Sequence, residues 1–261
     1  MEIIIVPTAA EAQEAAARLL RRQIQRKPGS VLGLATGSTP IGVYARLAQM
    51  HAAGEMDFAR ASTFNLDEYV GLEDSHPCSY RSFMHEHLFA KVNIDPSRIH
   101  FPDGMARDIP SHCKDYEAAI VRAGGIDLQL LGIGREGHIG FNEPSSSLAS
   151  RTRIKTLTPQ TVKDNARFFG SEEKVPRHVI TMGVGTIMDA RHCLMLATGT
   201  AKADVVARMA EGPITADLPG SILQMHPVCT LVVDAAAAVE LRRQDYYHWV
   251  YNNKPAWQRV S

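Results

Sequence analysis

The stretch Ile126-Asp-Leu-Gln-Leu-Leu-Gly-Ile-Gly-Arg-Glu-Gly-His-Ile-Gly-Phe-Asn-Glu-Pro144 decides how the rest of the chain is interpreted. Its first part, residues 126–132, is an apolar run that predicts a buried strand. The second part places Glu136 and Glu143 on either side of His138, among glycines that let a ligand approach the main chain. Acids that flank an imidazole set its tautomer and basicity near neutral pH. Because loops after strands carry sites in α/β proteins, we expect a site here; the alternative is a turn with solvated polar residues.

The composition is that of an ordinary globular protein without a strong electrostatic preference. Of its 261 residues, 45% are hydrophobic and 21% are charged, which is typical of soluble domains. Lysine and arginine together number 28, as do aspartate and glutamate, so the net charge attracts neither nucleic acid nor anionic lipid. No apolar run approaches the length that spans a membrane. We therefore expect no nucleic-acid partner and no membrane association.

The N-terminal residues and the cysteines favour a cytoplasmic protein. Residues 1–7 are too short and too acidic for a signal peptide, and they predict a first strand. The 4 cysteines are scattered and form no CxxC pair, which is typical of reduced thiols rather than of a disulfide framework or a zinc site. His85 and His87 lie two apart in a predicted helix, where their side chains diverge and make a poor chelate. We expect no metal site.

Short apolar runs alternate with longer amphipathic runs along the chain. The predicted strands are Ile3–Val6, Val31–Ala35, Ser62–Leu66, Ile126–Gly132, His178–Gly183, Cys193–Thr198 and Cys229–Val233. The predicted helices are Ala9–Arg26, Thr39–Ala53, Ser79–Phe89, Arg107–Ala123, Pro159–Phe169, Ala201–Glu211 and Ala235–Val250. This alternation predicts one α/β domain over residues 1–261, doubly wound, with a mainly parallel sheet and helices on both faces.

One polar segment, residues 145–176, interrupts the alternation directly after the suspected site. Polar segments beside a site are typical of lids and regulatory elements, so we expect an active-site lid at about residues 157–180. The alternative is a solvated surface insertion.

An anion site is predicted where the strand Val31–Ala35 runs into Thr36-Gly-Ser-Thr-Pro40 and a helix. Ser38 or Thr39 suits the helix cap, Pro40 suits the first turn, and the amides at a helix start attract anions. The segment lacks the lysine of a Walker loop and the spacing of a dinucleotide fingerprint, which disfavours ATP and NAD. A plain helix cap is the alternative interpretation.

Charged residues near other strand ends suggest a base and further phosphate ligands beside this anion site. Asp67 and Glu68 follow a predicted strand, at the edge where α/β proteins place ligands. Burial and a neighbouring negative charge would raise the pKa of one of them, which suits a base that moves a carbon-bound proton. Arg167 and Lys202 would add charge-assisted bonds to a phosphate held by the amides at residues 37–39. The alternatives are capping acids and ordinary surface cations.

Five motifs together resemble the glucosamine-6-phosphate deaminase family. They are Asn65-Leu-Asp-Glu-Tyr69, Gly137-His-Ile-Gly-Phe-Asn-Glu-Pro144, Leu148-Ala-Ser-Arg-Thr-Arg-Ile-Lys155, Ala166-Arg-Phe-Phe169 and Met182-Gly-Val-Gly-Thr186. The resemblance covers nearly the whole chain and follows the family order. It implies a Rossmann-like fold of the sugar-phosphate isomerase type and the conversion of glucosamine 6-phosphate and water to fructose 6-phosphate and ammonia. It also implies that no metal or organic cofactor is used.

The resemblance implies a role for each matching residue. Asp67 would be the base that moves a proton between C2 and C1, and Glu68 would line the same pocket. His138 would assist opening of the pyranose ring, oriented by Glu143 and by the acid at position 136. The phosphate would be held by Gly37, Ser38, Thr39, Arg167 and Lys202. Binding energy from that phosphate would position the reacting carbons against the base.

Some members of the family are hexamers that N-acetylglucosamine 6-phosphate activates at a site between subunits. The matching positions are Ser146, Arg153, Lys155 and Thr156. The resemblance therefore implies a homo-oligomer, a hexamer or its trimers, with this effector as a second partner. The chain departs from the family at His248, where a tyrosine of the last helix is expected.

Glu136 is a second departure, because the classical allosteric members carry aspartate there and others an uncharged residue. Compared with aspartate, glutamate has one more methylene, which keeps the charge but moves the carboxylate. Because other members carry an uncharged residue at this position, we still predict an active enzyme. The competing enzyme class is 6-phosphogluconolactonase, which needs no proton abstraction at C2; Asp67, Glu68 and the Phe-Asn-Glu-Pro ending favour the deaminase. A sugar-phosphate-sensing regulator would lack acids at positions 67 and 143.

Overall fold

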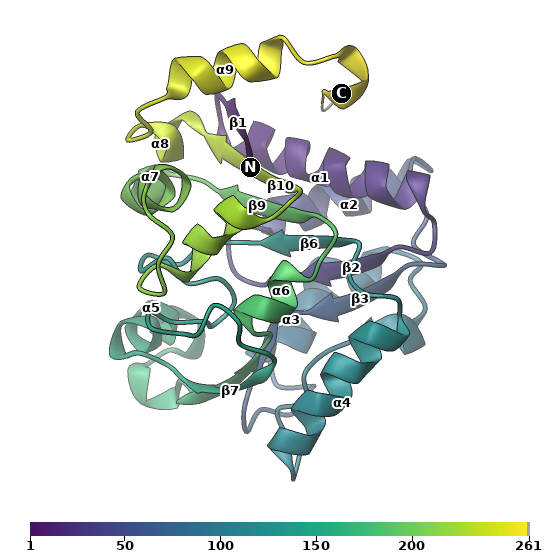
Figure 1. The fold of residues 1–261 in the computed structure, drawn as a ribbon. Coiled ribbons are helices and arrows are strands. Elements are labelled where there is room, and N and C mark those ends of the chain that lie inside the picture. The colour runs from purple at the N-terminus through teal and green to yellow at the C-terminus, as the bar shows by residue number, and fades with distance from the viewer. Residues whose placement is uncertain (260–261) are drawn as a thin grey trace.

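A seven-stranded parallel sheet forms the centre of the computed structural model, which describes residues 1–259 (Figure 1). The last two residues of the predicted domain, 260–261, lie outside the described part. The strand order is β1-β10-β9-β6-β2-β3-β5. The strands are β1 (Glu2–Val6), β2 (Val31–Leu34), β3 (Ser62–Asn65), β5 (Ile99–His100), β6 (Leu128–Leu131), β9 (Cys193–Ala197) and β10 (Cys229–Asp234). Every neighbouring pair in it is parallel.

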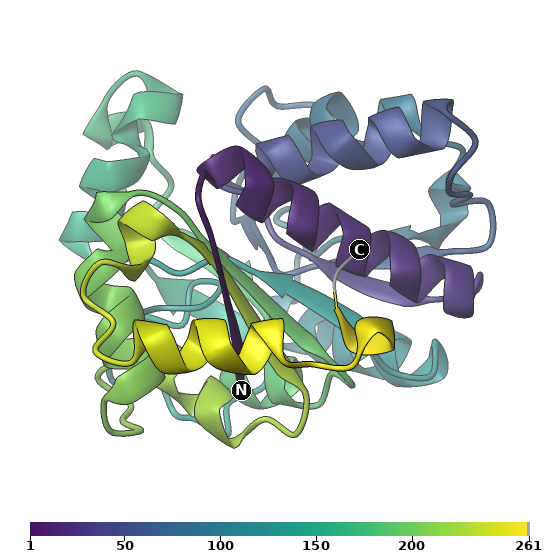
Figure 2. The same cartoon turned by 90° about the horizontal axis from the view of Figure 1, so that it is seen from above.

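Side chains alternate across the sheet and build a separate core on each face. In β10, Leu231 and Val233 join one core and Val232 joins the other. The first core lies under α4 (Ile109–Arg122), α6 (Val184–Met188), α7 (Ala203–Glu211) and α8 (Ala235–Ala238). The second lies under α1 (Ala9–Arg26), α2 (Ile41–Ala52) and α3 (Tyr80–His87). Figure 2 shows the purple-to-blue helices α1 and α2 on one side of the sheet. The predicted doubly wound fold is confirmed.

A second, antiparallel sheet was not expected from the sequence. Its order is β4-β8-β7, with β4 (Asp67–Tyr69), β7 (Arg153–Thr156) and β8 (His178–Thr181). The prediction of a strand at His178–Gly183 is correct, but that strand lies in the small sheet and pairs antiparallel with both neighbours. The short strands β4, β5 and β7 were missed, because two or three residues or a charged run carry little periodic signal.

The segment that carries α5 (Pro159–Phe169) packs on this small sheet through a core of its own. Val162 of α5 meets Tyr69 of β4 and Val179 of β8 there, together with Phe141. Residues 157–180, predicted as a lid, thus comprise α5, the turn after it and most of β8. This segment therefore packs on the small sheet and on Phe141 rather than on the central sheet.

The end of the chain also departs from the prediction of one helix over Ala235–Val250. The chain leaves α8 after Ala238 and re-enters a helix at α9 (Gln244–Asn252), which lies along the β1 edge of the sheet (Figure 1). The Glu211 carboxylate accepts the backbone N–H groups of Arg242 at 2.9 Å and Arg243 at 3.1 Å, and so competes with helical hydrogen bonding. No helix in residues 1–259 is long and apolar enough to span a membrane.

The strand order creates a switch point between β2 and β6. From β2 the chain continues to β3 and β5 on one side, whereas from β6 it continues to β9 and β10 on the other. Connections that diverge in this way leave a crevice outside the carboxyl ends of the two strands, where α/β proteins bind ligands. Both of these loops carry residues that the sequence predicts to form the site.

Candidate active site

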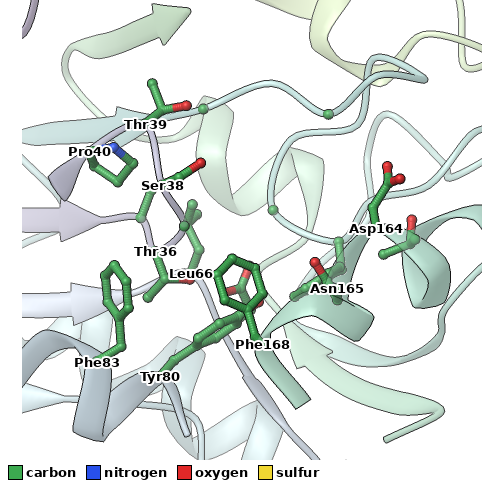
Figure 3. Close-up of a pocket in the computed structure, with 18 of the residues that line it drawn as sticks. Thr36, Ser38, Thr39, Pro40, Leu66, Tyr80, Phe83, Asp164, Asn165 and Phe168 are labelled. Carbon is green, nitrogen blue, oxygen red and sulfur yellow. The ribbon is translucent and has the colours of Figure 1, made fainter. Parts of the chain in front are cut away.

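A cavity of about 590 Å³ opens at this switch point. Figure 3 shows Thr36, Ser38 and Thr39 from the loop after β2 on one side of it, with Asp164 and Asn165 of α5 on the other. Of the residues predicted to form the site, Gly37, Ser38, Thr39, Asp67, His138, Arg167 and Lys202 line this cavity. The fold therefore brings together residues that are far apart in the chain, from Gly37 to Lys202.

The loop after β2 presents its backbone to the cavity. Gly37 has φ of +103°, a left-handed conformation that other residues adopt only with strain. The predicted cap by Ser38 or Thr39 is wrong: α2 begins after Pro40, and no side chain caps it. The first amides of α2 thus have no side-chain acceptor, which leaves the helix start open to an anion.

Cations face this loop from other elements. The Lys202 ammonium donates to the Ile133 carbonyl at 2.6 Å, and the Arg167 guanidinium lies 4.6 Å from the centre of the Phe168 ring. Burial lowers the pKa of Lys202, and repulsion from Arg135 and Arg167 adds to this effect, against the attraction of a nearby carboxylate. Arg135 also lines the cavity. Sequence analysis missed it, although it stands inside the opening motif.

Asp67 lies where the chain leaves the central sheet for the small one. It is 5% exposed, begins β4 one residue beyond the end of β3, and pairs with Thr181 of β8. Gly140 lies in the loop after β6, residues 132–144, which we call the catalytic loop. It closes over Asp67, since a Cβ there would lie 3.5 Å from an Asp67 oxygen and 2.9 Å from the Thr181 hydroxyl. Burial, with a smaller contribution from the charge of Glu68, raises the pKa of Asp67 well above its usual range. A buried carboxyl of raised proton affinity suits a base.

Glu68 does not line the cavity, so the prediction that it shares this pocket is wrong. Successive side chains on a strand point to opposite faces, and Glu68 is only 2% exposed. Its carboxylate accepts the backbone N–H groups of Tyr69, Tyr80 and Arg81. Its place is behind the base, at the start of α3.

His138 and Glu143 form the pair that the sequence predicts. Nδ1 of His138 lies 2.9 Å from a Glu143 oxygen, and the Thr161 hydroxyl of α5 donates to the other Glu143 oxygen at 2.6 Å. Burial would raise the pKa of Glu143, but the hydrogen bond and charge of His138, with the Thr161 bond, hold it below its usual value. An ionised Glu143 accepts from Nδ1–H, which leaves Nε2 as the basic nitrogen. Gly134 is needed beside it, because a Cβ there would lie 2.1 Å from Nε2.

Glu136 departs from its expected role. Its side chain is exposed, does not line the cavity, and comes only within 3.5 Å of the Thr158 hydroxyl. The acid that orients His138 in this structure is Glu143. The expectation that Glu136 also orients the imidazole is therefore wrong for this conformation.

The residues predicted for an effector lie outside the cavity. Arg153 of β7 donates to the Asn142 side chain at 2.8 Å, which links it to the catalytic loop. The Ser146 hydroxyl is buried without a hydrogen-bond partner among the described residues. Alternation along β7 places Thr156 on the opposite face from Arg153 and Lys155. The strand thus divides the predicted effector residues between its two faces.

A polar cluster of Tyr69, Tyr80 and Asn165 lines the cavity and was not predicted. The Asn165 amide of α5 donates to the Tyr69 hydroxyl at 2.9 Å, and the Tyr80 hydroxyl lies 3.3 Å from the same oxygen. Phe169 packs edge-on against Tyr69 at 5.2 Å. Tyr69 stands two residues after Asp67, so strand alternation offered a signal for it; Tyr80 and Asn165 offered none.

Comparison with known proteins gives a consistent result. The family model for glucosamine-6-phosphate isomerases/6-phosphogluconolactonase matches residues 7–232. Proteins named glucosamine-6-phosphate deaminase are 55% identical over 260 residues in Pseudarthrobacter chlorophenolicus and 53% identical over 261 residues in Streptomyces coelicolor, covering 100% of each chain. A solved structure described as a monomeric glucosamine-6-phosphate deaminase has a TM-score of 0.90 at 42% identity, covering 92% of this chain and 100% of its own. The 6-phosphogluconolactonase of Trypanosoma cruzi, at TM-score 0.74 and 20% identity over 92% and 97% of the chains, shares the fold alone.

Proposed function

Because this chain belongs to the family of glucosamine-6-phosphate isomerases and 6-phosphogluconolactonases, we propose that it converts glucosamine 6-phosphate and water to fructose 6-phosphate and ammonia. The motif resemblance to the deaminases is confirmed by relatives that match the chain over its full length. One observation carries the assignment of roles: Asp67, with a buried carboxyl, lines the same cavity as His138 and the cations.

The phosphate binds first in this scheme and positions the sugar. The amides at residues 37–39 and at the start of α2 donate hydrogen bonds to the phosphate, and Lys202 and Arg167 add charge-assisted bonds. A dianion between crowded cations relieves their mutual repulsion. The remote phosphate thereby holds C1 and C2 near Asp67, where proximity supplies much of the rate.

Ring opening precedes proton transfer. Nε2 of His138 takes the proton of the C1 hydroxyl and passes it to the ring oxygen as the bond between C1 and that oxygen breaks, and ionised Glu143 stabilises the imidazolium that forms in between. Asp67 then takes the proton from C2 while a proton of the substrate ammonium group moves to the aldehyde oxygen at C1, which gives an enolamine, and Asp67 returns its proton to C1. The resulting imine at C2 adds water and releases ammonia, which balances the reaction.

The segment 157–180 serves as a lid in this proposal. Its helix α5 contributes Thr161 to Glu143, Asn165 to Tyr69 and Arg167 to the cavity. Its Phe168 carbonyl accepts from the Cys78 thiol at 3.3 Å, across the mouth of the cavity. Closing of this segment would therefore bring Arg167 to the phosphate and Thr161 to Glu143, the partner of His138, at the same time.

The 6-phosphogluconolactonase reaction is the alternative, and it needs no base at C2. Lactone hydrolysis would need a base that activates water but no base at C2, so the pair Asp67 and Glu68 and the Phe-Asn-Glu-Pro ending of the loop favour the deaminase. The test is to supply each substrate in turn to the purified protein. Ammonia release from glucosamine 6-phosphate, with no acid release from the lactone beyond its spontaneous rate, is expected; the reverse result would refute the proposal.

Activation by N-acetylglucosamine 6-phosphate is a further part of the proposal. The orphaned Ser146 hydroxyl and the bond from Arg153 to Asn142 support a ligand site coupled to the catalytic loop. Division of the residues between the faces of β7, and exposed His248 in place of tyrosine, count against it. Turnover measured with and without the effector decides: a sigmoidal curve that becomes hyperbolic supports activation, and an unresponsive hyperbolic curve refutes it.

A cytoplasmic homo-oligomer, a hexamer or its trimers, completes the proposal. All cysteines of the chain are free thiols, which suits the reducing cytoplasm. The solved relative at 42% identity is described as monomeric, so the number of subunits has to be tested separately from the activity. Light scattering of the purified protein tests it, and the mass of a single chain would refute an oligomer.

A further inference from the structure

Glu68 is a buried acid that the proposed reaction does not use. It adjoins Asp67 in β4 but points to the other face of the strand, away from substrate. Buried charges persist when donors satisfy them, so its partners indicate what it does.

The partners of Glu68 come from two elements of the site. One carboxylate oxygen accepts from Tyr69 N at 2.9 Å and Tyr80 N at 3.0 Å, and the other accepts from Arg81 N at 3.0 Å. Tyr80 and Arg81 form the first turn of α3, where backbone N–H groups lack intrahelical acceptors and the helix dipole favours an anion. Burial raises the pKa of Glu68, while these three bonds oppose the rise and favour its ionised form.

These contacts tie the strand of the base to a wall of the cavity. β4 carries Asp67, and α3 contributes Tyr80 and Phe83 to the cavity lining. If the carboxylate were lost, buried amides of both elements would lose their acceptor at once.

We propose that Glu68 is a positioning residue, which fixes the strand of Asp67 to α3 and holds a hydrogen-bonded carboxylate behind the base. The inference rests on the proposed role of Asp67 in proton transfer. A fixed anion behind a carboxylate makes that carboxylate a stronger base, because the charged form is disfavoured in a site with little water.

Two other acids belong to the site: Glu143, which is paired with His138, and Asp164 of α5, which lines the cavity among the cations. Among the described residues, Glu68 is the acid whose charge adds to the rise in the pKa of Asp67. Tyrosine hydroxyls face Asp67 from α2, β4, α3 and α4, namely Tyr44, Tyr69, Tyr80 and Tyr116. Burial raises the pKa of each, so all are neutral at neutral pH. The positive groups around the site are Arg81 of α3, Arg135 of the catalytic loop, Arg167 of α5 and Lys202. Positive charge would weaken the base, so Glu68 opposes the cations.

The test compares the pH dependence of kcat/KM for the wild type and Glu68→Gln. Glutamine keeps the shape but removes the charge, so the ionised form of Asp67 becomes easier to reach. We expect the acid limb to move down by about one pH unit, with lower turnover on the plateau. Titration of the substrate amine and phosphate is common to both enzymes and cancels in the difference.

Two further variants separate charge from fold. Glu68→Asp keeps the charge but shortens its reach, so its acid limb should stay in place while turnover falls; full turnover, or a shifted limb, would overturn the proposal even if Glu68→Gln does not fold. Ser82→Ala is the matched control, since it removes the bond from the Ser82 hydroxyl to the Asp74 carbonyl in the same turn of α3 without changing a charge. Its pH profile should match the wild type.

The outcomes distinguish this inference from the proposal beneath it. A Glu68→Gln enzyme with the wild-type limb and turnover would overturn the role of Glu68 and leave Asp67 as the base. A fully active Asp67→Asn enzyme would instead overturn the assignment of the base itself.

Discussion

The floor of the cavity at Asp67 and its wall at Lys202 both crowd groups of like charge, but with opposite sign. At the floor, burial and then Glu68 raise the pKa of Asp67. At the wall, burial and then Arg135 and Arg167 lower the pKa of Lys202. Each region therefore favours the neutral form of its ionisable group before substrate binds. At the floor, Asp67 loses its negative charge when it takes a proton; at the wall, the positive charges are balanced when a phosphate binds. The difference separates proton transfer from binding within one cavity.

The largest effect should follow from a change at the floor. Asp67→Asn removes the base but keeps the side-chain shape, so kcat should fall by about 10³-fold or more, with little change in KM. Ammonia release under saturating glucosamine 6-phosphate measures it. If Asp67→Asn instead raised KM for glucosamine 6-phosphate and left kcat unchanged, Asp67 would act in binding, and proton transfer would not be separated from binding in this cavity.

A change at the wall should affect binding instead. Lys202→Met keeps the length of the side chain and removes its charge, so KM should rise by about 10- to 100-fold, while kcat changes far less. The same steady-state assay measures both constants. Arg135→Met is the matched comparison, with a smaller rise expected because the Arg135 side chain is 65% exposed.

The floor should also cost stability, which thermal unfolding can measure. Since burial raises the folded-state pKa of Asp67, the folded protein loses stability as pH rises through that pKa, whereas asparagine does not titrate. Asp67→Asn should thus melt a few °C higher than the wild type at neutral pH, about 2–4 °C per kcal/mol. The gain should shrink as pH falls toward the ordinary range of aspartate. A gain that does not depend on pH would show that the charge is not its source.

The smallest effect is expected at Glu136, which belongs to neither region. Because its side chain is exposed and bonds to Thr158 rather than to His138, Glu136→Asp should leave turnover within about tenfold. A larger loss would place Glu136 in the site during catalysis, after a movement of the loop or of α5.

The sequence predicts the central sheet and the position of the site far better than the small sheet. Strands such as β10, buried along their whole length, read as apolar runs, and glycines mark the loops that follow β2 and β6. β4 is Asp-Glu-Tyr, and its strand form and burial come from pairing with β8, which no local pattern reveals.

Charge patterns located the acids but did not give the direction of their side chains. His138 and Glu143 were predicted to pair, and they do. One step along a strand turns Glu68 away from the cavity, and Gly137, with φ of +81°, separates Glu136 from His138. Such directions depend on backbone geometry that residue types alone do not fix.

The most direct test of the separation between floor and wall is calorimetric titration of Asp67→Asn and Lys202→Met with fructose 6-phosphate, without ammonia. Asp67→Asn should bind within about threefold of the wild type although its turnover is lost, and Lys202→Met should bind about 10- to 100-fold more weakly. A folded Asp67→Asn protein that no longer binds fructose 6-phosphate, or a Lys202→Met protein that binds like the wild type, would contradict the account.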